Sequence, residues 1–432
     1  MVSIEVNNLN KNGLGLLKNL PKSVLSKINI SHNFLINNKD TEIEVTIISG
    51  STPNEISQVV NSLGGKYTDL GYGYGLVLIP IGNIVALATS PQIQYIELPK
   101  SLYTADYQSN RASCITQIST ENNLRGQGVL IGFIDTGIDY THPAFRNADG
   151  TTRIEYIYDL YEGGKIYNRS QINEALKSSN PYSIVSSTDV AGHGTHVAGI
   201  IAGSGQVTGM YCGIAPKANL LVLKVLDNNG NGNTTSVLEG IDWLLKNRIH
   251  YGVRLLNISV GMLKNAGEKE KRELLDAVDT AWDAGIMVVT AAGNNGPKEN
   301  TVTIPGISRK VLTVGCMDDE AVNLGHNILK EGYSGTGPTD CCIMKPEILA
   351  PGTNVTSCSR DGKGYVKKSG TSMAAPAVTG TLALAFERFT ELTPAEMKLR
   401  LYESAYARGE YFHKKAWGMI HGDNLVRYRS IG

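Results

Sequence analysis

Short aliphatic runs alternate with longer amphipathic segments from about Tyr103 to the C-terminus, and this alternation is what most restricts the fold. Buried strands are predicted where the apolar residues run together, at residues 129–134, 220–226, 255–260, 286–290 and 311–314. Helices with one apolar stripe are predicted over residues 235–248 and 270–284. Strands that alternate with helices form a mostly parallel sheet covered on both faces. The sequence therefore predicts a doubly wound α/β domain over residues 103–432, with its site at the carboxyl ends of the strands.

The first 102 residues follow a different pattern. Helical spacing is predicted at residues 54–63 and 83–88, and strands are predicted at residues 42–48, 66–70, 75–79 and 92–97. The resulting order, βαββαβ, is the split motif of ferredoxin-like domains. We therefore expect a small N-terminal α+β domain over residues 1–102, in which residues 1–40 are an extension without a clear pattern.

Charge and composition exclude several classes of partner. The 432 residues include 40 basic and 40 acidic side chains without a block of like charge, so no nucleic-acid or membrane-surface partner is expected. No apolar run reaches the ~18 residues of a membrane span. The polar, Asn-rich N-terminus lacks the pattern of a secretory signal, which predicts a cytoplasmic protein and leaves export by another route open. Six cysteines are too few for a disulfide scaffold, so free thiols are expected.

Three polar residues stand where a parallel sheet would place reactive groups. Asp135 directly follows the predicted strand at 129–134, and His193 lies in a glycine-flanked turn that opens a helix. Ser372 lies between a glycine and a helical run, at a helix N-terminus that favours developing negative charge. Acyl transfer uses a hydroxyl nucleophile, an imidazole base and a carboxylate that orients the imidazole. The three residues are therefore candidates for a catalytic triad.

The segments around these residues resemble the signature blocks of the subtilases, the subtilisin-like serine proteases. The matching blocks are DTGID at 135–139, HGTHVAG at 193–199, AAGNNG at 291–296 and GTSMAAP at 370–376, and the resemblance covers about residues 126–426. It implies a subtilisin-like fold and a serine endopeptidase. In that family's mechanism Asp135 would orient His193, His193 would be the general base and then acid, and Ser372 the nucleophile. Asn294 would donate a hydrogen bond to the oxyanion.

The resemblance also implies the edges of a cleft that binds protein or peptide substrates as an added β-strand. One edge is formed by Gly230, Asn231 and Gly232, and the other by Ser259, Val260 and Gly261. The pocket for the P1 side chain would be walled by Ala291, Ala292 and Gly293. Thr303 falls where relatives often have glycine at the base of this pocket, which predicts a short pocket that disfavours large aromatic P1 residues.

No metal or other cofactor is expected. Many relatives have a calcium-binding aspartate where this chain has Ala144, and residues 203–209 offer few carboxyl or amide oxygens. Because calcium takes six to eight oxygen ligands, the family's high-affinity calcium site is not expected here. His193 and His196 lie three residues apart, but a third ligand at suitable spacing is missing, so His196 is predicted to be a helix-packing histidine rather than a metal ligand.

The N-terminal domain resembles the propeptides of this family. The resemblance implies self-cleavage between about residues 101 and 106, after which the propeptide stays bound as an inhibitor. The long stretch at 153–185 is similar to clostridial spore-germination subtilases, although no room remains for their inserted β-domain. Two other functions stay open: a binding or signalling pseudoenzyme whose triad is blocked by a retained propeptide, and transfer to a nucleophile other than water.

Overall fold

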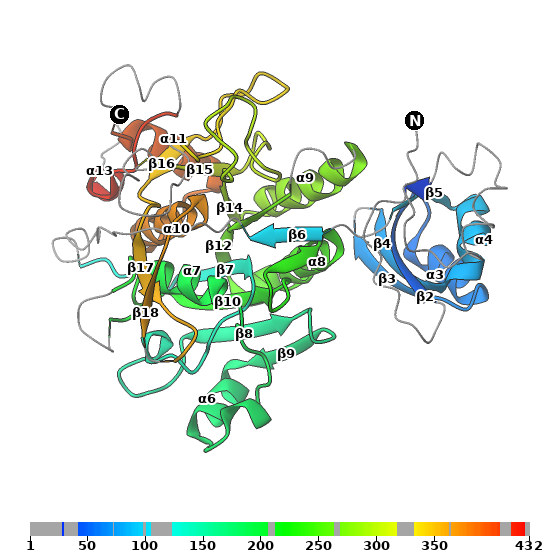
Figure 1. Cartoon of the computed structure of the whole chain (residues 1–432), viewed down its shortest axis with the longest axis horizontal. Helices are drawn as coiled ribbons and strands as arrows, with labels where there is room; N and C mark the ends of the chain where they lie inside the picture. The colour runs from blue at the N-terminus through cyan, green and yellow to red at the C-terminus, as the bar shows by residue number, and fades with distance from the viewer. Residues whose placement is uncertain are drawn as a thin grey trace, which may run out of the picture. The chain divides into compact units, whose positions relative to one another are not determined.

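The computed structural model describes residues 28–29, 42–71, 73–97, 101–104, 123–205, 212–262, 268–317, 332–362, 364–406 and 416–427. The chain forms two compact units. One contains Met1–Ser101 with Asn233–Asp242, and the other contains Leu102–Gly232 with Trp243–Gly432. Figure 1 shows both, coloured from blue at the N-terminus to red at the C-terminus.

The N-terminal unit contains a five-stranded sheet in the order β1-β5-β2-β4-β3. Its elements are β1 (Ile28–Asn29), β2 (Glu42–Ser49), α3 (Pro53–Ser62), β3 (Lys66–Gly71), β4 (Tyr74–Pro80), α4 (Ile84–Thr89) and β5 (Ile93–Glu97). β2 pairs antiparallel with both β4 and β5, and alternate residues such as Val45, Ile47 and Val77 form the core with Ile56 of α3. The predicted βαββαβ order is confirmed, because the alternation in the sequence is that of strands buried on one face.

The larger unit is built on an eight-stranded sheet in the order β16-β15-β14-β12-β7-β10-β8-β9. Its strands are β7 (Leu130–Asp135), β8 (Ile154–Asp159), β9 (Lys165–Asn168), β10 (Asn219–Lys224), β12 (Val253–Ile258), β14 (Met287–Ala291), β15 (Leu312–Cys316) and β16 (Ile348–Ala350). All neighbouring strands are parallel except β9, which runs antiparallel to β8. Every residue of β7, β14 and β15 is buried, which explains their unbroken apolar runs. The predicted mostly parallel sheet is confirmed.

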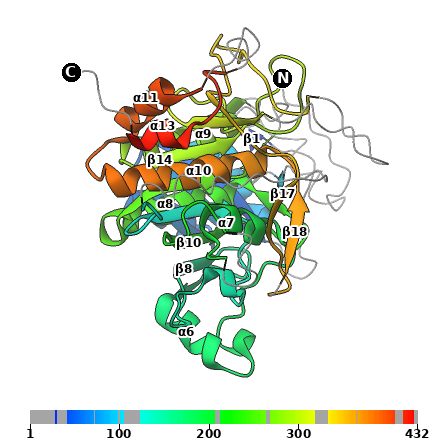
Figure 2. The same cartoon turned by 90° about the vertical axis from the view of Figure 1, so that its left-hand side faces the viewer.

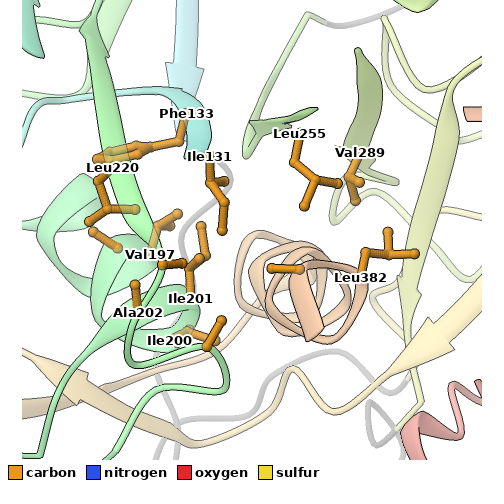
Figure 3. Packing of buried hydrophobic residues seen from close by; sticks show 14 of the residues in the cluster. Ile131, Phe133, Val197, Ile200, Ile201, Ala202, Leu220, Leu255, Val289 and Leu382 are labelled. Carbon is orange, nitrogen blue, oxygen red and sulfur yellow. The ribbon is translucent and has the colours of Figure 1, made fainter. Parts of the chain in front are cut away.

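Helices cover both faces of this sheet. The helices are α6 (Arg169–Lys177), α7 (His193–Ala202), α8 (Thr234–Tyr251, of which the part from Trp243 belongs to this unit), α9 (Glu268–Asp283), α10 (Thr371–Arg388), α11 (Pro394–Ser404) and α13 (Gly422–Arg427). α7 and α10 pack against one another on one face (Figure 2), and Figure 3 shows Val197 and Ile201 of α7 in one cluster with Ile131 of β7. On the other face, Leu244 of α8 lies close to Gly132. The first residues of α7 and α10 therefore reach the carboxyl edge of the sheet.

Two hairpins and a small three-stranded sheet contain the remaining described strands. β8 and β9 form the edge of the sheet and lead into α6, which lies beyond them in Figure 1 and Figure 2. The second hairpin is formed by β17 (Val355–Cys358) and β18 (Tyr365–Lys368). Three short strands form a separate sheet in the order β11-β6-β13, and they are β6 (Ser101–Thr104), β11 (Asn231–Asn233) and β13 (Val260–Gly261). Within the described ranges, no helix combines the length and the hydropathy that a membrane span requires.

Candidate active site

Asp135 and His193 form a buried pair. Asp135 is the last residue of β7 and His193 the first residue of α7, and both side chains are excluded from solvent. His193 Nδ1 lies 2.7 Å from Asp135 Oδ1, which also accepts a hydrogen bond from the Thr136 backbone N–H at 2.8 Å. Because a carboxylate only accepts, this bond places the imidazole hydrogen on Nδ1 and makes Nε2 the nitrogen that can take up a proton.

Ser372 lies at the start of α10, directly after Gly370 and Thr371. Its hydroxyl donates to the Ser259 carbonyl oxygen at 3.0 Å, and the Ser259 hydroxyl donates back to the Ser372 carbonyl at 3.2 Å. The structure thus brings the predicted nucleophile together with one predicted edge of the cleft. Proton transfer from Ser372 to His193 stays a prediction, supported by the packing of α7 on α10.

Asn294 is held by the residue that precedes the predicted nucleophile. Its side-chain oxygen accepts from the Thr371 backbone N–H at 3.0 Å and from the Thr371 hydroxyl at 3.1 Å. The Thr371 hydroxyl also accepts from the Gly293 backbone N–H at 3.0 Å. These bonds fix the side chain of Asn294 through its amide oxygen, and its role as an oxyanion donor stays a prediction.

The two predicted edges of the cleft are strands on either side of β6. Asn231 and Gly232 belong to β11, and Gly230 lies in the turn before it with a positive φ of 80°. On the other side, β13 pairs antiparallel with β6, so that Val260 opposes Thr104 and Gly261 opposes Tyr103. β6 thus lies between the two strands that the prediction assigns to the edges of the cleft, and substrate binding there stays a prediction.

Thr303 fills the space between two glycines of the predicted P1 pocket. A β-carbon on Gly293 would come within 2.4 Å of Thr303 Cγ2, and one on Gly261 would come within 2.7 Å of Thr303 Oγ1. The Thr303 backbone N–H donates to the Ala292 carbonyl at 2.9 Å, and both Ala291 and Ala292 are buried. Thr303 thus packs against both glycines, and the short P1 pocket stays a prediction.

Asp189, which was not predicted from the sequence, is a buried carboxylate that accepts four hydrogen bonds. Its Oδ1 accepts from the Thr136 hydroxyl at 2.7 Å and the Gly192 N–H at 2.8 Å. Its Oδ2 accepts from the N–H and hydroxyl of Thr195, at 2.8 and 2.7 Å. The Thr136 hydroxyl in turn accepts from the Gly194 N–H at 2.9 Å. Asp189 thus ties the residue after Asp135 to the residues that flank His193. The sequence feature that could have pointed to Asp189 is a carboxylate a few residues before the start of a helix.

His196 packs within the domain as predicted. Its Nε2 donates to the carbonyls of Val355 and Val366, at 3.0 and 3.1 Å, and so holds the β17–β18 hairpin to α7. Burial lowers the pKa of His196 to about 3, which keeps the imidazole neutral. Groups of three or more His, Cys, Asp or Glu side chains that could hold a metal ion are absent from the described ranges, and no disulfide joins the five cysteines within them.

Both parts of the chain match known protein families. The subtilase family model matches residues 126–421, and the Csp protease B prodomain model matches residues 8–100. Serine protease AprX of Bacillus subtilis (strain 168) is 37% identical over 294 residues, which are 64% of this chain and 60% of AprX. Subtilisin DY of Bacillus licheniformis is 31% identical over 291 residues, covering 67% of this chain and 88% of that protein.

Solved structures agree with these matches. The Clostridium perfringens CspB protease superimposes with a TM-score of 0.65 and 27% identity, over 75% of this chain and 100% of that one. Fervidolysin from Fervidobacterium pennivorans, at 20% identity and a TM-score of 0.64, shares the fold over 92% of this chain and 62% of its own. The resemblance implied by the four sequence blocks and the similarity to clostridial relatives are both confirmed. The chain belongs to the subtilase family of serine proteases and carries a prodomain of the Csp type.

Proposed function

We propose that this subtilase is an active serine endopeptidase that hydrolyses peptide bonds through an acyl-enzyme. The observation that carries the proposal is the buried 2.7 Å pair of Asp135 and His193 at the first residue of α7, the helix that packs against the Ser372 helix. A neutral imidazole oriented by a carboxylate is the base that a serine nucleophile requires.

Each residue has one role in the proposed reaction. The Ser372 oxygen attacks the carbonyl carbon while its proton passes to His193 Nε2, and Asp135 stabilises the imidazolium. The oxyanion accepts hydrogen bonds from the Asn294 amide and the Ser372 backbone N–H, and each such donor contributes about 10²–10³ in turnover. His193 then protonates the leaving amine. In the second half of the reaction a water molecule attacks the acyl-enzyme, His193 takes its proton, and Ser372 is released with its hydroxyl restored.

The substrates are extended segments of proteins or peptides. β11 and β13 offer backbone groups on both sides of the cleft, so affinity comes mainly from main-chain hydrogen bonds. Thr303 restricts the P1 pocket, which favours small P1 side chains. We also propose that the protein resides in the cytoplasm and that its activity needs no metal cofactor.

The register of β6 points to one bond for self-cleavage inside the expected window of residues 101–106. Thr104 opposes Val260; Ala105 is the next residue in the sequence, and Ser259 directly precedes Val260. Ala105 itself lies outside the described residues. The Ser259 carbonyl accepts the Ser372 hydroxyl, and alanine suits a short P1 pocket. We therefore place the proposed cut between Ala105 and Asp106, after which the propeptide remains as an inhibitor.

Intact mass spectrometry tests both the activity and the bond. The wild-type protein is expected to yield two fragments that end at Ala105 and begin at Asp106, and Ser372→Ala is expected to stay full length. A cut in purified Ser372→Ala protein would refute self-processing. A cut of the wild type at another bond within the window would refute the register argument and leave the protease assignment intact.

A further inference from the structure

Arg153 is a buried cation directly before β8. Its side chain is 3% exposed, and its guanidinium donates to three backbone carbonyls. Nη2 donates to Ala144 at 2.6 Å and to Ala202 at 2.5 Å, and Nη1 donates to Ala218 at 2.8 Å. In the part of the chain that the structure describes, no carboxylate forms an ion pair with it. The positive charge is therefore compensated by backbone dipoles.

The three carbonyls come from three different segments. Ala144 lies in the short 3-10 helix Pro143–Phe145, Ala202 is the last residue of α7, and Ala218 directly precedes β10. The carbonyl end of a helix carries a partial negative charge, so a cation at Ala202 stabilises α7. Burial lowers the pKa of Arg153 to about 10, which leaves the guanidinium protonated at neutral pH.

The residues around Ala144 do not fit the calcium site that family membership implies. Ala144 contributes a methyl group where a ligand carboxylate would stand. Its carbonyl oxygen already accepts from Arg153 and from the Ser204 N–H at 2.8 Å. A calcium ion that shared this oxygen would lie close to a buried guanidinium, and like charges repel strongly in such surroundings.

We infer that Arg153 takes the place of a bound metal as the cation that ties these segments together. α7 is then held at both ends by buried charges, with Asp189 beside its first residues and Arg153 at its last residue. Because His193 is the first residue of α7, the hydrogen bond from Arg153 to the Ala202 carbonyl also stabilises the helix that carries the proposed base. The inference concerns stability and does not rest on the proposed peptidase activity.

Thermal unfolding of the full chain in the Ser372→Ala background tests the inference without self-digestion. The midpoint is expected to be the same in EDTA and in calcium chloride. Arg153→Met, which removes the charge at similar volume, is expected to lower the midpoint by roughly 5 °C or more, and Arg153→Lys by less. Arg169→Met is the matched control, because Arg169 is 40% exposed and pairs with Glu155 near the surface.

Two results would overturn the inference. One is an unfolding midpoint that falls in EDTA and recovers with calcium, accompanied by calcium bound to the purified protein. The other is an Arg153→Met protein as stable as Arg169→Met. If Arg153→Met does not fold, Arg153→Lys and the chelation experiment on the parent protein still decide the question.

Discussion

Replacing Asp189 by asparagine is expected to weaken both the fold and the catalysis. Each oxygen of Asp189 accepts one backbone N–H and one hydroxyl, from Gly192 and Thr136 on one side and from Thr195 on the other. Asparagine keeps one acceptor oxygen, so in either orientation its amide nitrogen faces a buried backbone N–H. A buried donor without an acceptor costs about 1–3 kcal/mol, and the lost charge-assisted bonds add a similar amount. We expect a loss of about 3–5 kcal/mol in the free energy of unfolding.

The same substitution should lower kcat about tenfold or more and leave KM nearly unchanged. The reason is that Asp189 acts on His193 through Thr136 and Gly194, and that among the described residues its hydrogen bonds go to Thr136, Gly192 and Thr195 rather than to β11 or β13. Urea unfolding in the Ser372→Ala background gives the stability, and a peptide substrate gives kcat and KM.

Matched variants separate this positioning role from a general loss of stability. Thr136→Ser keeps the hydroxyl and should retain kcat, whereas Thr136→Val should lose it. Asp149→Asn is the control for charge, because Asp149 is exposed and caps only a local turn at Thr151. An Asp189→Asn protein with the stability of Asp149→Asn and full kcat would refute the reasoning.

Three further predictions concern the oxyanion site, the pocket and the response to acid. Asn294→Leu should lower kcat about 10²–10³-fold with little change in KM, and a raised KM at unchanged kcat would contradict the assignment. Thr303→Gly should raise kcat/KM for substrates with phenylalanine at P1 relative to alanine; an unchanged ratio would mean that Thr303 does not limit the pocket. The folded-state pKa of His196, about 3, lies below its unfolded value of about 6.5, so the unfolded state takes up more protons in acid. Because of His196, the free energy of unfolding should fall by about 1.4 kcal/mol for each pH unit of acidification between roughly pH 6.5 and pH 3. Urea unfolding of His196→Gln should therefore depend less steeply on pH in that range than urea unfolding of the wild type.

The elements that sequence reasoning predicted are those whose residues carry a local signal. β7 and β14 are buried on both faces, so their apolar runs are unbroken, and the N-terminal domain alternates because one face of its sheet is packed. The proposed catalytic residues lie in short motifs at the ends of such elements. The boundaries differ by a few residues; α8, for example, ends at Tyr251 rather than residue 248.

The features that were missed depend on partners far away in the chain. Asp189 meets Thr136 across 53 residues, and Arg153 meets Ala218 across 65 residues. In the sequence, Arg153 stands among polar and aromatic residues and resembles an ordinary surface arginine. Only the folded backbone shows that three carbonyls converge on it. The role of Thr371 in holding Asn294 likewise appears only when the loop after β14 meets the start of α10.

Labelling of the processed protein with a fluorophosphonate probe tests most directly whether Ser372 is an activated nucleophile. The account predicts one adduct per chain, located on Ser372 by peptide mapping, with labelling abolished in Ser372→Ala and slowed by several orders of magnitude in His193→Ala. A folded, processed protein that does not react, or that reacts at another residue, would contradict the assignment and favour the pseudoenzyme.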